Sequence, residues 1–271
     1  MISLTYGVNS MSTSKLSSKD LDDLRSAKQL LENPGFAAKV ANLIGVPIEA
    51  GFKLLPQGAK DMIATATKKS LESALHVAVS TMKNGTYTSS NWSHKAAVIA
   101  SGALGGAFGL PALAVELPIS TAIMLRSIAD IARSEGESIA SVDGRLACLE
   151  VFALGGRNDG DDGMETAYYA TRAALARAIA EAAQFVAERS VVQESAPPLL
   201  ALIAQISTRF GIQVSEKAMA QLLPVIGAAG GAVVNTLFID HFQDMARGHF
   251  IVRRLERTYG EEVVETAYNS N

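Results

Sequence analysis

Cysteine is almost absent from this sequence, which holds Cys148 and no other. A single thiol cannot form a disulfide within the chain or supply a set of thiolate metal ligands. Charged residues are also scarce, at 19% of the chain against roughly one quarter in a typical soluble protein. Because the formal net charge is −3, the chain has no overall attraction to phosphate backbones, and a nucleic-acid partner is not expected.

Aromatic residues make up only 6% of a chain that is 48% hydrophobic, so its apolar content is mostly Ala, Leu, Ile and Val. Ala and Leu favour helices. No segment of useful length alternates apolar and polar residues as a half-buried strand would. The sequence therefore predicts an all-α fold, a multi-helix bundle in which Gly/Ala-rich central helices pack closely.

The sequence predicts one helical domain between two short tails. Residues 1–16 are rich in Ser and Thr and lack helical periodicity, which is typical of a flexible tail. Residues 17–260 are expected to form a single α-helical domain, and residues 261–271 a loose C-terminal tail. The first residues lack the basic and then apolar pattern of a secretory signal, so the expected location is the cytoplasm.

Proline and glycine indicate where helices should begin and end. Pro118 is expected to interrupt an apolar helix, and Gly211 to end another. Pro224 suits the first turn of a long helix that continues to Tyr259, because an amide hydrogen is not needed there. Gly260 is expected to end that helix.

Two apolar segments, residues 96–124 and 218–239, are long enough to raise the question of a membrane span. Both contain glycines four residues apart, a spacing that lets helix backbones approach closely. Glu116 and Pro118 interrupt the first segment, and the second is rich in Ala and Gly, which partition weakly into lipid. We therefore predict helices buried in a soluble bundle, with an integral membrane protein as an alternative.

Two segments carry motifs of a known family. They comprise Leu223-Pro224-Val225-Ile226-Gly227-Ala228, followed by Asn235, Ala246, Phe250 and Arg253, and the more central Gly105-Gly106, Leu117-Pro118, Leu125-Arg126, Ile131-Ala132 and Gly136. These segments resemble signatures of the EcsC family, and the resemblance extends over residues 34–257. It implies an all-α fold and a membrane-related role, since the family's founding member is encoded beside an ABC transporter. It implies no activity, cofactor or catalytic residue.

One side of the long C-terminal helix carries a stripe of residues spaced three or four apart, namely Gly227, Gly231, Asn235, Phe238 and Phe242. The glycines permit a close helix crossing, and the Asn235 amide would then be buried and need hydrogen-bond partners. Two interpretations stay open. Asn235 bonds a neighbouring helix, through its backbone or through Glu116, or it lines a ligand cavity.

No catalytic motif is present, since the chain lacks Gly-x-Ser-x-Gly, His-Glu-x-x-His and a phosphate-binding loop. The only acid–base candidates are Glu116, which is alone among apolar residues, and the neighbours Asp240 and His241. Asp240 and Asp244 share a helix face, but no His-x-x-x-His spacing accompanies them. We therefore predict no metal site and no cofactor.

Four arginines gather near the end of the same helix, at Arg247, Arg253, Arg254 and Arg257. Cations at this end could contact anionic lipid headgroups, each contributing about 1 kcal/mol near a charged membrane. The helix dipole alone also favours cations at a helix C-terminus. The sequence leaves both interpretations open.

These observations favour a non-enzymatic, membrane-associated helical protein. We expect it to be peripheral to the inner membrane face and to bind membrane lipid or a membrane protein, in a role accessory to transport or secretion. A second copy of the chain is a further partner that the small-residue faces could accept. The alternatives are a hydrolase that acts on a lipid or peptide, and an integral membrane protein.

Overall fold

A computed structural model describes residues 16–32, 35–44, 55–82, 110–155, 167–189, 195–222 and 227–270. All regular structure in these parts is helical, which confirms the predicted all-α class. The helices are α1 (Ser18–Glu32), α2 (Phe36–Ile44), α4 (Gln57–His76), α6 (Leu110–Ser134), α7 (Val142–Glu150), α8 (Ala167–Ala187), α9 (Pro197–Leu222), α10 (Gly227–Tyr259) and α11 (Glu261–Ser270). Two shorter pieces continue α4 and α7, the π-helical turn η1 (Val77–Thr81) and the 3₁₀ turn η2 (Val151–Ala153).

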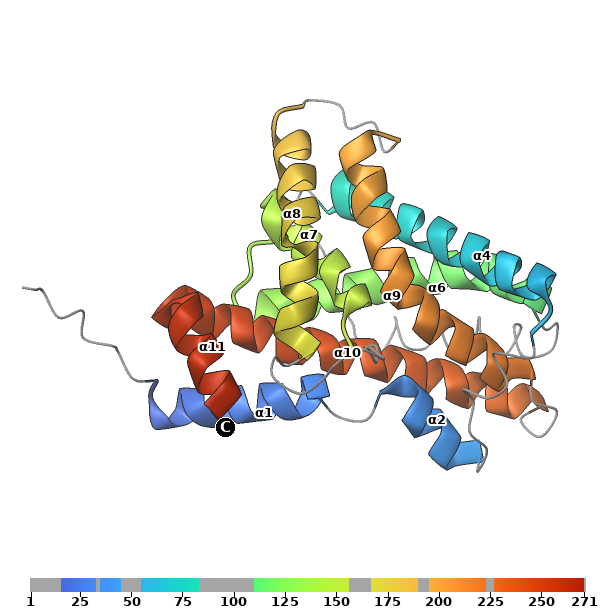
Figure 1. The fold of residues 1–271 in the computed structure, drawn as a ribbon, viewed down its shortest axis with the longest axis horizontal. Coiled ribbons are helices and arrows are strands. Elements are labelled where there is room, and N and C mark those ends of the chain that lie inside the picture. The colour runs from blue at the N-terminus through green and yellow to red at the C-terminus, as the bar shows by residue number, and fades with distance from the viewer. Residues whose placement is uncertain are drawn as a thin grey trace, which may run out of the picture.

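The long helix α10 is the element against which most others pack (Figure 1). Helices α1 and α2 contact it from one side, and α6 runs beside it with α4 packed along α6. Helix α9 contacts both α4 and α10, and α8 packs against α9 and α7. Helix α11 turns back toward α1 after the end of α10, so the first and last described helices lie on the same side of the bundle.

Serine side chains cap the N-termini of two of these helices. The hydroxyl of Ser17, just before α1, accepts a hydrogen bond from the amide of Asp20 at 3.2 Å and donates to its carboxylate at 2.6 Å. Ser141 Oγ accepts from the amide of Gly144 at 3.0 Å at the start of α7. Each contact satisfies an amide that the helix itself leaves without a partner.

Helix α6 continues through Pro118, so the predicted interruption is wrong. A proline inside a helix removes one hydrogen bond, here the bond to the carbonyl of Ala114. Ala114 is exposed, so water can solvate that carbonyl. Leu117 and Thr121, on the inward side of the helix, are fully buried. The burial of this side keeps the helix continuous, because tertiary packing rather than local propensity supplies most helix stability.

Helix α9 likewise continues through Gly211, where an end was predicted. A glycine inside a helix costs about 1 kcal/mol relative to alanine. Phe210 and Val214 on either side of it are fully buried, and burying such a side chain contributes roughly 1.5–3 kcal/mol. The packing of these neighbours therefore outweighs the cost of the glycine.

The C-terminal end forms helix α11 rather than the expected loose tail. Val264 and Tyr268 lie four residues apart on one face of α11, and both are fully buried. The Tyr268 ring stacks on Tyr168 with a centroid distance of 5.7 Å. Lys28 Nζ of α1 lies 5.1 Å from the centre of the Tyr268 ring. These contacts attach the end of the chain to α8 and α1.

The predicted end of the long C-terminal helix is confirmed. Helix α10 ends at Tyr259, and Gly260 follows with a φ of +90°, a conformation that glycine adopts without strain. The predicted start at Pro224 and residues 1–15 of the predicted tail lie outside the described residues, whereas Leu16, the last residue of that tail, is buried.

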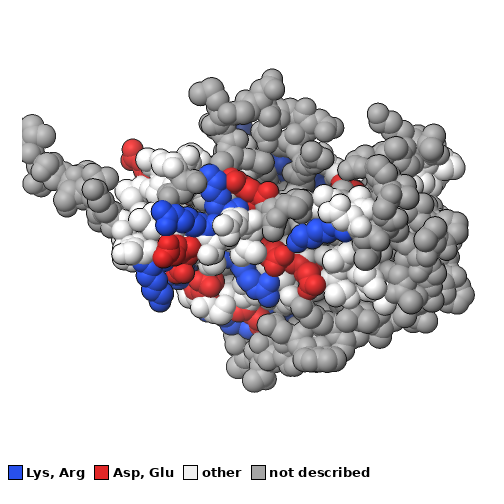
Figure 2. Space-filling model, turned by 90° about the horizontal axis from the view of Figure 1, so that it is seen from below, with Lys and Arg blue, Asp and Glu red and all other residues white. Residues whose placement is uncertain are grey.

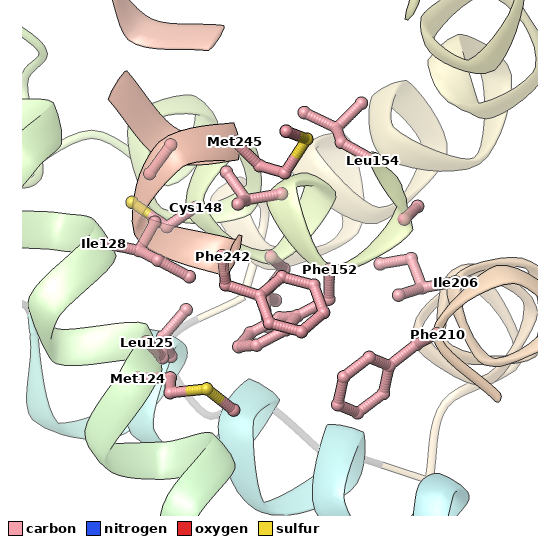
Figure 3. Close-up of a cluster of buried hydrophobic side chains, with 14 of the residues drawn as sticks. Met124, Leu125, Ile128, Cys148, Phe152, Leu154, Ile206, Phe210, Phe242 and Met245 are labelled. Atoms are coloured by element: carbon pink, nitrogen blue, oxygen red, sulfur yellow. The ribbon is translucent and has the colours of Figure 1, made fainter. Parts of the chain in front are cut away.

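Aromatic rings fill the core where η2, α9 and α10 meet (Figure 3). The ring centroid of Phe152 lies 5.1 Å from that of Phe210 and 5.3 Å from that of Phe242. The Phe210 and Phe242 centroids are 5.5 Å apart, and all three side chains are fully buried. Tilted and edge-to-face pairs at these distances are favourable beyond the area they bury, so this cluster joins the three elements.

Gly248 allows α1 to approach α10 closely. A Cβ atom at this position would lie 2.6 Å from Leu31 Cγ and 3.0 Å from the carbonyl oxygen of Ala27. Both neighbours belong to α1 and are buried, and the carbonyl oxygen of Ala27 cannot move without shifting that helix. This close crossing lies at Gly248, outside the stripe of Gly227 and Gly231 for which the sequence predicted one.

We expect Gly248→Ala to destabilise the protein by about 1–2 kcal/mol, because overpacking outweighs the gain of about 1 kcal/mol in helix propensity. The measurement is the free energy of unfolding in urea. Gly58→Ala is the control, since nothing lies within 4 Å of a Cβ added there. Equal stability of the two variants would contradict the close contact between α1 and α10.

Candidate functional site

An ion pair is buried between α9 and α6. Lys217 Nζ donates hydrogen bonds to both carboxylate oxygens of Glu116, at 2.8 Å and 3.1 Å. The two side chains are 0% and 4% exposed, so water screens the pair very little. Burial lowers the pKa of Lys217, while the attraction of the Glu116 carboxylate opposes that shift.

Asn235 of α10 completes this group. Its Nδ2 donates to Glu116 Oε1 at 3.2 Å, and Lys217 Nζ lies 4.8 Å from the centre of the Phe238 ring. Three helices therefore contribute to one polar cluster, Glu116–Lys217–Asn235, inside the apolar core. The sequence left two interpretations of Asn235 open, and this hydrogen bond to Glu116 is the one in which Asn235 binds a neighbouring helix.

The stripe predicted on α10 faces the core. Asn235, Phe238 and Phe242 are at most 1% exposed, and Phe238 meets Phe36 of α2 edge to face at 5.2 Å. Gly231 is buried as well, whereas Gly227 is the first residue of α10 and the structure does not describe its surroundings. The described part of the stripe packs against neighbouring helices.

The candidate acid–base groups do not share one environment. Glu116 accepts hydrogen bonds from Lys217 and Asn235. The centroid of the His241 ring instead lies 5.1 Å from that of Phe242, and the ring packs against Gly155. Burial and then the positive charge of Lys39 lower the pKa of His241 to about 3, so its imidazole is neutral at physiological pH.

Asp240 and Asp244 do not form a metal centre with these groups. Asp240 is half-buried on α10, and Asp244 pairs with Lys39 at 3.2 Å and with Arg247 at 3.0 Å. Among the described residues, no three His, Cys, Asp or Glu side chains are grouped to hold a metal ion.

The predicted cluster of arginines pairs with carboxylates, and Figure 2 shows basic and acidic side chains interspersed on the face that it presents. Besides the pairing of Arg247, Arg253 forms a two-pronged pair with Glu137 at 3.0 Å and 3.1 Å. The other contacts are Arg254 with Asp23 and Glu135, and Arg257 with Glu137. The positive charge is therefore largely balanced within the protein, and a role at a lipid surface stays a prediction.

Lys217 is the member of the polar cluster that sequence reasoning missed. The signal available was its spacing on α9. Lys217 follows the apolar Phe210 and Val214 at steps of four and three, which places it on the same buried face. A lysine on such a face needs an acidic partner, and Glu116 was the one carboxylate in an apolar segment.

One described helix, Pro111–Ser134, is long and apolar enough to cross a membrane by length and composition. Of its most apolar stretch, 56% is buried inside the protein. A core helix of a soluble protein meets the same criterion, so this finding is weak evidence for a span.

The fold and its buried polar cluster define an all-α protein with closely packed, small-residue helices. The model of the EcsC protein family matches residues 13–255, most of the chain. The chain belongs to the EcsC protein family, as the sequence motifs predicted. No curated protein and no solved structure matches it.

We expect Lys217→Met to destabilise the protein by about 3–5 kcal/mol, because it leaves the Glu116 carboxylate buried without its counterion. Adding Glu116→Gln should recover much of that loss, since Gln can still accept from Asn235 and carries no charge. Urea unfolding of both single variants and the double variant measures the coupling. Lys69→Met, at an exposed position of α4, is the control, and additive losses at positions 116 and 217 would refute the coupling.

The buried His241 should make the folded protein less stable in acid. The unfolded chain protonates His241 below about pH 6.5, whereas the folded protein does so only near pH 3. The folded state is therefore stabilised above pH 6.5 and loses about 1.4 kcal/mol per pH unit from this residue as the pH falls toward 3. His241→Asn should remove that dependence. The measurement is the difference in unfolding free energy between variant and wild type at pH 7.5 and pH 5, and a difference that stays constant would contradict the buried, neutral imidazole.

Proposed function

We propose that this member of the EcsC family is a non-enzymatic, membrane-associated protein of the cytoplasm that binds lipid at the inner face of a membrane. The observation that supports this proposal is the outward face of α6. A role accessory to a membrane transporter or to secretion follows from the same attachment and is part of the proposal.

The outward face of the first half of α6 is apolar and uncharged, whereas Arg126, Asp130 and Arg133 are half-buried farther along the helix. Val115 is 69% exposed and Ile119, one turn later, is 53% exposed. Across residues 110–123 the one charged side chain is Glu116, which points inward to Lys217. Large apolar side chains exposed together on one helix face are typical of a surface that binds a partner or a membrane.

The rest of α6 favours attachment over spanning. Its inward face is engaged with α4, and the buried Glu116 has its partners inside the protein. A helix with one face inside the protein and one apolar face outside suits the boundary of a bilayer rather than its interior. Lys69 is exposed on the neighbouring α4, and the exposed Lys68 lies 3.9 Å from Glu72 on the same helix. Exposed positive charge is attracted to anionic headgroups.

The test is co-sedimentation of the full chain, purified without detergent, with vesicles of phosphatidylglycerol and phosphatidylethanolamine. Wild-type protein should sediment with these vesicles. The double variant Val115→Glu/Ile119→Glu should bind the vesicles with an affinity lower by roughly tenfold or more. Two apolar side chains no longer enter the lipid, and two carboxylates are repelled by it.

The control is Leu200→Glu, which changes an exposed apolar residue of α9 in the same way. Its binding should match that of the wild type. Wild-type protein that stays in the supernatant with every vesicle would overturn lipid binding and favour a membrane-protein partner. Protein recoverable only in detergent would overturn peripheral attachment and favour an integral protein.

A further inference from the structure

A cavity of about 530 Å³ lies between α7, α8, α10 and α11. This volume is within the range of roughly 300–1,000 Å³ that is typical of small-molecule sites. Part of its wall is aliphatic and formed by small side chains, among them Ala147, Ala173 and Ala176. The lining comes from four separate helices, and none of the motifs in the sequence pointed to it.

Glu150, the last residue of α7, lines this cavity although it is only 5% exposed. Among the described residues, none donates a hydrogen bond to its carboxylate, and its ion-pair contact is with His249 Nε2 at 3.7 Å. That distance is too long for a hydrogen bond. The Glu150 oxygens are not among the fully buried atoms that lack a partner, so they are in contact with the cavity. An acceptor to which the protein supplies no donor is left for water or a ligand to satisfy.

His249 does not balance the charge of Glu150. Its Nδ1 lies 3.0 Å from the hydroxyl of Tyr168, and its ring is completely buried. Burial, followed by the positive charges of Arg172 and Arg253, holds the pKa of His249 well below its usual value. The imidazole is therefore neutral and offers no positive charge to the carboxylate.

The two arginines that line the cavity are already paired. Arg172 forms a two-pronged ion pair with Glu256 at 2.5 Å and 2.9 Å, and Arg253 forms one with Glu137 at 3.0 Å and 3.1 Å. Such planar pairs use the donor fork of the guanidinium group. The cavity is thus not an anion site, because its positive groups are balanced by carboxylates of the protein.

Three further carboxylates line the cavity, those of Asp143, Glu261 and Glu265. Together with Glu150, they outnumber the two arginines of the lining, and no lysine is among the described residues that line the cavity. Glu150 is contributed by α7, and α11 contributes two of the other acids. The unbalanced charge of the cavity is therefore negative.

We propose that this cavity binds a small organic cation, a linear diamine or polyamine, with one ammonium group held by Glu150. The ammonium group supplies the hydrogen-bond donors and the charge that the carboxylate lacks. The methylene chain lies along the alanines, and a second ammonium group lies near the carboxylates of Glu261 and Glu265. This site lies on other helices than the outward face of α6 and does not depend on the proposed lipid binding.

The surroundings of Glu150 also predict how binding depends on pH. Burial raises the pKa of Glu150 to about 7, with Glu256 raising it further and Arg172 and Arg253 acting in the opposite direction. A proton on Glu150 and an ammonium group compete for the same oxygens. Binding should therefore be tighter at pH 8 than at pH 6, and His249 stays neutral over this interval.

The experiment is isothermal titration calorimetry of the full chain with spermidine and with 1,8-diaminooctane. The matched uncharged probe is 1,8-octanediol, which should not bind. Glu150→Gln keeps the volume of the side chain and removes its charge, and it should weaken binding by roughly tenfold or more. Glu181→Gln is the control, because Glu181 is exposed on α8, pairs with Arg177 and does not line the cavity.

Three outcomes would overturn the proposal. They are absence of amine binding by the wild type, equal binding of diamine and diol, and undiminished binding by a folded Glu150→Gln variant. If Glu150→Gln does not fold, the pH dependence of amine binding by the wild type is the test. An affinity that is the same at pH 6 as at pH 8 would contradict a role for the Glu150 carboxylate. Loss of amine binding in this variant with vesicle binding retained would show that the two proposals are separate.

Discussion

The contact on which the arrangement of the helices depends is the ion pair between Lys217 and Glu116. Each charge is buried and neither can be left without the other at acceptable cost. Because the partners come from α9 and α6, and Asn235 of α10 binds the same carboxylate, the pair fixes how far each of three helices can slide along its neighbours. The Phe238 ring, whose centre lies 4.8 Å from Lys217 Nζ, packs against the pair from α10, the helix that also contributes Asn235.

The fold class followed from composition, but several helix ends did not. Pro118 and Gly211 have unfavourable local propensities, and both lie inside helices. In each case the neighbouring side chains are buried against other helices, and the free energy of that burial is a property of the tertiary fold. Gly260 behaved as predicted because it follows the last turn of α10, where no burial opposes the local preference.

The polar cluster could be predicted only in part. Asn235 and Glu116 stood out because each is a polar residue in an apolar segment, and their hydrogen bond was one of two interpretations of the sequence. Lys217 lies 101 residues from Glu116, and no local pattern shows which buried charges will meet. The same limit applies to Arg253, whose neighbours along the helix do not reveal that Glu137, far away in sequence, neutralises it.

Helix α11 lies outside residues 13–255, the part of the chain that the family model covers. It nevertheless forms one wall of the cavity between α7, α8 and α10, through Glu261 and Glu265. Helices α7, α8 and most of α10 lie within the matched region, so the family model covers three of the four helices that line the cavity. Substitutions at Glu261 and Glu265 can therefore change the charge of the cavity while Val264 and Tyr268 keep α11 attached to the other helices.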